Sequence, residues 1–138
     1  MAADNPKRPT VEPGGFQNLL GYEITDWDVG QATIVLDVDE RHGNRHGLAH
    51  GGVLMTILDA ACTRAGAVDP ETDEIRRAAT VSMTTNFVAP VKPGRVRAEA
   101  VTTGGGRRLF FAEAKAYDAD GNLVATAAAT CRYASPAK

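Results

Sequence analysis

All three histidines of the chain fall within one short segment, as His42, His46 and His50. A spacing of four residues would place them on one face of a helix, where histidines can bind zinc. However, Gly43 and Gly47 interrupt the segment, and each glycine destabilises a helix by about 1 kcal/mol relative to alanine. No cysteine or carboxylate other than Glu40 stands at metal-ligand spacing nearby to complete a ligand set. We therefore expect a loop without a metal site, in which the first two histidines are exposed to water.

His50 differs from the other two because Gly51 and Gly52 follow it and open an apolar segment. The first N–H groups of a helix have no partner within the helix and lie at its positive end. Glycines let a ligand approach such a backbone closely. This arrangement suits a carbonyl oxygen that gains negative charge during a reaction. Alternatively, the two glycines only permit a sharp turn from loop to helix.

Asp59 lies inside the same apolar segment, on a polar stripe with Thr56 and Thr63. A buried carboxylate is unfavourable unless it is hydrogen-bonded, so the two threonines could give Asp59 a purely structural role. The alternative is a catalytic carboxylate. Asp59 is eight residues past Gly51, which is ~12 Å along a helix and too far for both to act on one bond. Two copies of the chain in a symmetric dimer could share two sites, each copy contributing one of the residues to each site.

Hydrophobic periodicity predicts the elements that position these residues. The segment 52–67 is the only long helix, and because it is apolar almost all round it should be surrounded by protein. Alternation of period two in "ATIVLDVDE" indicates a strand with one buried face. The other expected elements are a helical turn at 16–21, strands at 22–30, 78–90 and 94–103, and a hairpin within 108–133 that turns at 118–122. This order predicts an α+β fold with a mostly antiparallel sheet around one helix.

Length and composition fit one intracellular domain. The 138 residues suffice for a single core, with residues 1–15, which contain three prolines, as a mobile tail and 16–138 as the domain. Fifteen Lys and Arg against 17 Asp and Glu give a net charge of −2, which argues against nucleic-acid binding. No apolar run is long enough to span a membrane. Cys62 and Cys131 stand in apolar runs, which favours buried free thiols and a cytoplasmic location.

Several of these residues form an ordered set that resembles the hotdog-fold acyl-CoA thioesterases, in particular the PaaI-like group. The resemblance covers about residues 16–133. It is carried by Asn44, Gly47, His50, Gly51, Gly52 and Asp59, by Thr80 on a strand that ends at Pro90, and by the Gly106-Arg107 step. The resemblance implies a hotdog fold, with a curved, mostly antiparallel sheet wrapped around one long central helix. It also implies homodimers with a continuous sheet, often doubled into homotetramers, and hydrolysis of acyl-CoA without a metal or other cofactor.

The resemblance further implies a role for each matching residue. The Gly51 N–H would polarise the thioester carbonyl, while His50 and Asn44 hold the acyl group or the water. Asp59 of the partner subunit would be the general base or the nucleophile. Thr80 would position the water or the carboxylate.

Coenzyme A carries phosphates, which call for a cationic rim. Arg107 and Arg108 follow three glycines, of which Gly106 is the last, and could hold a pyrophosphate, although each could equally be a solvated surface charge. Gly52, Ser82 and Phe87 are the remaining candidates for substrate binding.

Two other functions fit the same fold. A non-catalytic acyl-CoA-binding or regulatory protein could keep Gly51 and the arginines while Asp59 stays idle. A hydroxyacyl thioester dehydratase would use a catalytic histidine in another local setting. The acyl group itself (aromatic, medium-chain or branched) is left open by the sequence.

Overall fold

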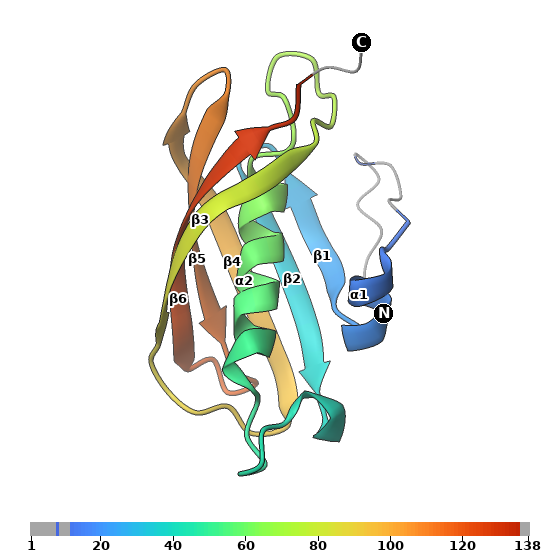
Figure 1. Cartoon of the computed structure of the whole chain (residues 1–138), viewed down its shortest axis with the longest axis vertical. Helices are drawn as coiled ribbons and strands as arrows, with labels where there is room; N and C mark the ends of the chain where they lie inside the picture. The colour runs from blue at the N-terminus through green and yellow to red at the C-terminus, as the bar shows by residue number, and fades with distance from the viewer. Residues whose placement is uncertain (1–7, 9–11, 136–138) are drawn as a thin grey trace.

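The computed structural model describes residue 8 and residues 12–135 and contains one antiparallel sheet with a long helix against it (Figure 1). The predicted tail, residues 1–15, falls largely outside the described residues, and its last residue already belongs to a helix. The elements in chain order are α1 (Gly15–Leu20), β1 (Glu23–Asp28), β2 (Gln31–Val38), a 3₁₀ turn (Glu40–His42), α2 (Gly51–Ala65), β3 (Ala78–Phe87), β4 (Gly94–Gly105), β5 (Leu109–Tyr117) and β6 (Leu123–Tyr133). The strand order is β1-β2-β4-β5-β6-β3. The predicted α+β layout is therefore confirmed.

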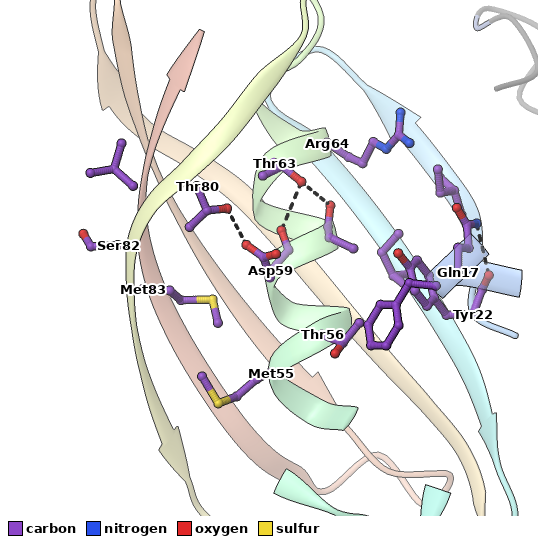
Figure 2. Close-up of a pocket in the computed structure, with 15 residues that line it drawn as sticks. Gln17, Tyr22, Met55, Thr56, Asp59, Thr63, Arg64, Thr80, Ser82 and Met83 are labelled. Atoms are coloured by element: carbon purple, nitrogen blue, oxygen red, sulfur yellow. Dashed lines mark hydrogen bonds between the residues drawn. The ribbon is translucent and has the colours of Figure 1, made fainter. Parts of the chain in front are cut away.

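The sheet curves around α2, which contacts all six strands (Figure 1). The inner face of the helix is buried, with Ile57 and Leu58 at 0% exposure. Its outer face is more open, because Met55 is 39% exposed and Asp59 is only half-buried (Figure 2). The sequence predicts that protein surrounds α2 on all sides. Within one chain, this is true of the inner face of the helix and not of its outer face.

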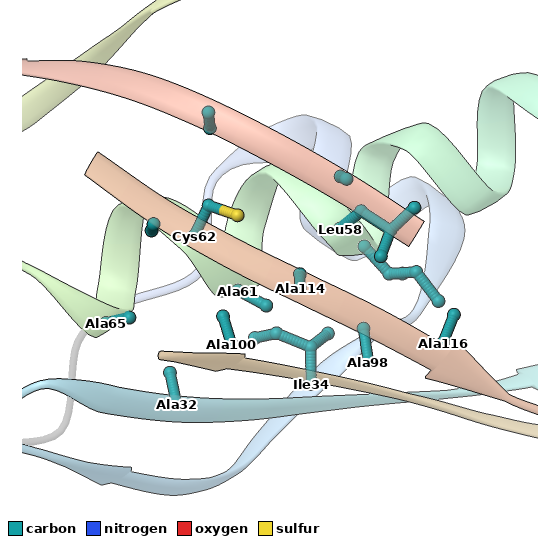
Figure 3. Close-up of a cluster of buried hydrophobic side chains, with 14 of the residues drawn as sticks. Ala32, Ile34, Leu58, Ala61, Cys62, Ala65, Ala98, Ala100, Ala114 and Ala116 are labelled. Atoms are coloured by element: carbon teal, nitrogen blue, oxygen red, sulfur yellow. The ribbon is translucent and has the colours of Figure 1, made fainter. Parts of the chain in front are cut away.

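Alanines bring α2 close to the sheet. Ala61 and Ala65 on the helix are completely buried, and alanines of β2, β4 and β5 face them (Figure 3). These strand residues are Ala32, Ala98, Ala100, Ala112, Ala114 and Ala116, each at most 2% exposed. Because an alanine side chain is a single methyl group, the backbones of helix and sheet can approach closely and still exclude voids.

Both ends of α2 are defined by specific contacts. His50 is the N-cap residue, and its Nδ1 accepts a hydrogen bond of 2.9 Å from the Gly52 N–H. Gly66 ends the helix where the ring of Phe110 lies against it, and a Cβ at this position would come within 2.2 Å of that ring. Only glycine leaves room for Phe110 there.

His42 corrects the expectation from the sequence that it would be exposed. The side chain is 2% exposed and holds two segments together. Its Nδ1 accepts the Asp39 N–H at 2.9 Å, so its Nε2–H donates to the Leu20 carbonyl at 2.7 Å. His42 is thus a structural residue of the core, whereas His46 is exposed as expected.

The two cysteines are free and buried, as predicted. Burial raises the pKa of the Cys62 thiol to about 12, and burial also raises the pKa of Cys131. No helix among the described residues is long and apolar enough to cross a membrane.

Candidate active site

The first group of candidate residues lies at the N-terminus of α2. His50 uses its side chain to cap the helix, so the Gly52 N–H is already hydrogen-bonded. The Gly51 N–H, in contrast, has no acceptor in the part of the chain that the structure describes. It is therefore the donor that remains available to a ligand at the positive end of the helix.

Asn44 shapes the loop that leads to this helix end. Its Oδ1 accepts the backbone N–H groups of His46 at 2.8 Å and Leu48 at 3.2 Å. Its own N–H donates to the Leu48 carbonyl. These hydrogen bonds give Asn44 a structural role in the loop, and its side-chain amide nitrogen has no hydrogen bond to the other described residues.

Phe87, the last residue of β3, reaches the same place. The side chain is 54% exposed, so it is not the core residue that its type would suggest. A Cβ on Gly51 would lie 3.3 Å from the Phe87 ring. A ligand at the Gly51 N–H would therefore meet an aromatic wall on one side.

The second group centres on Asp59, halfway along α2. The Thr80 hydroxyl of β3 donates a short hydrogen bond to Asp59 Oδ1 (Figure 2). Neither threonine of the polar stripe satisfies the carboxylate, because Thr56 donates to the Gly52 carbonyl and Thr63 donates to backbone carbonyls. The alternative in which these two threonines pair with Asp59 is therefore wrong.

A cavity of about 590 Å³ opens beside Asp59. It extends over the outer face of α2 between β3 on one side and β1 with α1 on the other. Four consecutive residues of β3, from Thr80 to Met83, line it. A β-bulge between Thr80 and Ser82 breaks the regular alternation of the strand there. The structure thus brings Thr80 to Asp59. Ser82 also borders the cavity, but it is exposed and its side chain points away from Asp59 on the other side of β3 (Figure 2).

Within one chain the two groups do not form one site. Gly51 and Asp59 belong to the same regular helix, so ~12 Å of helix axis separates them. The strand that carries Thr80 and Phe87, β3, is an edge strand with no strand paired on its outer side among the described residues. Such an edge can pair with another chain.

The third group is a set of arginines at the other end of the sheet. Arg107 and Arg108 follow Gly106 in the turn between β4 and β5, as expected, and line a cavity of about 470 Å³. Arg76 and Arg132 line the same cavity, although no sequence pattern had pointed to either residue. None of these four arginines forms an ion pair with a carboxylate within residues 8 and 12–135. A cavity with four unpaired arginines is suited to a phosphorylated ligand.

Metal-binding side chains do not gather in the described part of the chain, where no group of three or more His, Cys, Asp or Glu residues could hold an ion. His50 caps α2 and His42 is in the core, so the histidine segment is organised by backbone contacts.

Comparison with known proteins identifies the family and supports the fold. The family model of the thioesterase superfamily matches residues 46–125, which is more than half of the chain and includes the helix start, Asp59 and Thr80. The chain belongs to the thioesterase superfamily and has its hotdog fold.

Individual relatives have related names. A candidate esterase of Saccharolobus solfataricus is 29% identical over 82% of this chain and 73% of its own length. The 1,4-dihydroxy-2-naphthoyl-CoA hydrolase of Listeria monocytogenes is 31% identical over 62% of this chain and 68% of its own length. A solved structure of a point mutant of the phenylacetic acid degradation protein PaaI from Thermus thermophilus is 28% identical, with a TM-score of 0.75. The match covers 86% of this chain and 98% of that one. The predicted similarity to the PaaI-like group is thereby confirmed, and thioester hydrolysis is the activity that these relatives support.

Proposed function

We propose that the protein is an acyl-CoA thioesterase that hydrolyses its substrate at two sites shared between the subunits of a homodimer. The observation that carries the proposal is the pair of features on α2. One is the Gly51 N–H without an acceptor, and the other is the Asp59 carboxylate that Thr80 orients in an open cavity. Because they are ~12 Å apart on one helix, each needs its complement from a second copy.

The reaction uses a water molecule and one carboxylate. Thr80 occupies only Asp59 Oδ1, and Oδ2 has no hydrogen bond to any other described residue. The partner's Asp59 takes a proton from the water through Oδ2, and the water oxygen attacks the thioester carbon. The carbonyl oxygen becomes negatively charged and accepts a hydrogen bond from the Gly51 N–H. The C–S bond then breaks, and the thiolate of CoA receives the proton from Asp59. Direct attack by Asp59 to form a transient anhydride is the other route that this arrangement permits.

The four-arginine cavity supports CoA as the leaving group. Arg107 and Arg108 were expected to contact phosphates, and Arg76 and Arg132 double the positive charge around that cavity. The Arg76 guanidinium is held 3.7 Å from the centre of the Tyr133 ring. This stacking keeps a planar group with several N–H donors in place for a phosphate.

His50 argues against the dehydratase alternative, because its Nδ1 is occupied by the helix cap.

The proposed hydrolysis requires no metal and no redox cofactor. Pairing of the β3 edges would extend the sheet across the dimer and cover an exposed edge strand. Two such dimers could associate into a homotetramer.

Mixing two inactive variants tests the shared site. Asp59→Ala keeps the Gly51 N–H, and Gly51→Pro keeps the carboxylate. After subunit exchange, about half of the dimers are hybrids, and each hybrid has one complete site out of two. The equimolar mixture should therefore recover about a quarter of the parent's thiol release from acyl-CoA.

The matched control carries both substitutions in one chain and is mixed with the parent. A shared site predicts that activity falls to about a quarter of the parent's, because every hybrid is inactive. Sites contained within one chain predict about one half, since each hybrid keeps one intact site. A value of one half, together with no recovery in the first mixture, would disprove the shared site.

A further inference from the structure

The cavity beside Asp59 continues across the outer face of α2 to β1. Arg64 and Tyr22 line it on the β1 side of the helix, whereas Thr80 lies on the β3 side (Figure 2). Apolar side chains, including Ile24, line the same cavity. One end is therefore the candidate reaction centre, and the other end carries a positive charge.

Arg64, like Arg76, is half-buried and has no carboxylate partner among residues 8 and 12–135. The Arg64 guanidinium lies 4.9 Å from the centre of the Trp27 ring. Burial lowers the pKa of Arg64, although an arginine stays charged at neutral pH. By contrast Arg95, which is exposed, has Asp37 at 2.8 Å. A partly desolvated cation without an anion is unfavourable, and a bound anion would offset that penalty.

Tyr22 provides a second donor at this end. Burial raises the pKa of its hydroxyl, so the group stays protonated at neutral pH. Tyr22 and Arg64 both line the cavity beside Asp59. They therefore offer a hydroxyl and a guanidinium to an anion in that cavity.

We propose, on the basis of the thioesterase function above, that Arg64 and Tyr22 bind a carboxylate at the far end of the acyl group. The preferred substrates are then CoA thioesters of dicarboxylic acids. The thioester carbon lies at Asp59, the methylene chain lies along the apolar wall, and the terminal carboxylate reaches Arg64. The five residues from Asp59 to Arg64 correspond to ~7.5 Å along the helix axis, which suits a chain of medium length.

A phosphate of CoA is the rival source of an anion. Arg64 also borders a smaller cavity of about 340 Å³, together with Arg76 and Arg77. The acyl group is favoured because Arg64 shares a cavity with the candidate base, whereas the four-arginine cavity already offers a separate place for phosphates.

The test compares pairs of CoA esters that have equal chain length and differ in the terminal group. Adipyl-CoA against hexanoyl-CoA and suberyl-CoA against octanoyl-CoA are suitable pairs. The parent should show a kcat/KM at least about tenfold higher for the dicarboxylic member of a pair, as one charged hydrogen bond allows. Equal values, or a preference for the monocarboxylic esters, would overturn the proposal.

Variants locate the effect at Arg64. Arg64→Met keeps an apolar stem against Trp27. It should bring the ratio of kcat/KM for the dicarboxylic ester to kcat/KM for the monocarboxylic ester close to one, while hydrolysis of hexanoyl-CoA persists. Arg64→Lys keeps the charge and should keep part of the preference for dicarboxylic esters. It also tests the role of Arg64 if the Met variant folds poorly. Arg95→Met removes the same charge from an exposed position and should leave the ratio of kcat/KM values for the two members of a pair unchanged.

Inhibition by free CoA separates the two anion sources. If Arg64→Met weakens this inhibition and lowers kcat/KM equally for all four esters, Arg64 contacts a phosphate and the proposal is wrong. If the parent releases no thiol from any ester, the thioesterase function itself fails. Equilibrium binding of the same pairs then decides the present proposal, because adipyl-CoA must still bind about tenfold more tightly than hexanoyl-CoA.

Discussion

Gly51→Pro isolates the contribution of a single backbone N–H. Gly51 is the first residue of α2, the position at which proline is best tolerated because its missing N–H would have no partner in the helix. The preceding residue must be extended before a proline, and His50 already has φ −63° and ψ 138°. The substitution should therefore leave the helix intact and remove only the donor that we assign to the carbonyl oxygen.

The expected size follows from the role of that donor. Loss of one such hydrogen bond lowers kcat about 10²- to 10³-fold, or about 2.7–4 kcal/mol of transition-state stabilisation. Proline also introduces a Cβ, which would lie 3.3 Å from the exposed ring of Phe87. Gly51→Ala introduces the same Cβ and keeps the N–H, so it measures the effect of crowding alone. We expect the alanine variant to lose less than about tenfold, because an exposed ring can move.

The assay is thiol release from acyl-CoA under saturating substrate, with folding checked by circular dichroism and thermal unfolding. The informative number is the ratio of kcat for the alanine variant to kcat for the proline variant. If both variants fold like the parent and this ratio is near one, the Gly51 N–H does not stabilise the transition state.

Three further predictions concern other parts of the molecule. Thr80→Val should lower kcat about tenfold or more because Asp59 loses its orienting hydrogen bond, whereas Thr80→Ser should stay near the parent; equal activities would contradict this role. Gly66→Ala should lower Tm by about 3–10 °C, since a Cβ there overlaps the Phe110 ring and overpacking destabilises by about 1–3 kcal/mol; an unchanged Tm in a calorimetric scan would refute the clash. The pKa of the Cys62 thiol is about 12 in the folded chain, against 9.0 for an ordinary thiol. As pH rises, the thiol therefore loses its proton at a lower pH in the unfolded chain than in the folded chain. The free energy of unfolding should therefore fall as pH rises above about 9, and Cys62→Ala should show a weaker fall in denaturant titrations.

Local patterns were sufficient for the elements of the fold. The alternation in 32–38 identified β2, and the turn at 118–122 identified the hairpin of β5 and β6. Both signals come from residues close together in sequence, where strand periodicity and turn chemistry act directly. The same is true of α2, whose observed bounds differ by one or two residues from the prediction.

Contacts between distant residues could not be read in this way. His42 is buried because the Leu20 carbonyl, 22 residues away, accepts its Nε2–H. Asp59 is paired with Thr80, 21 residues away, although its neighbours on the helix were the obvious candidates. The resemblance had placed Thr80 near the site, but a single sequence contains no physical signal for that hydrogen bond.

The arginine cavity illustrates the same limit for charge. Arg107 and Arg108 stood out because glycines precede them, whereas Arg76 and Arg132 have unremarkable neighbours. The pairing of β3 with β6 and of β5 with β6 brings these segments to one end of the sheet. Only the sheet register therefore shows that the four positive charges share one cavity.

The alanine contact between α2 and the sheet limits how new substrate preferences can arise. A larger side chain at Ala61 or Ala65 would push the helix off the strands and displace Gly51 and Asp59, the two groups of the proposed site. Directed evolution toward other acyl groups should therefore find its productive substitutions on the outer face of α2, at Met55 and Thr63. Neither side chain belongs to the core cluster between the helix and the sheet, so each can change size with little effect on that contact.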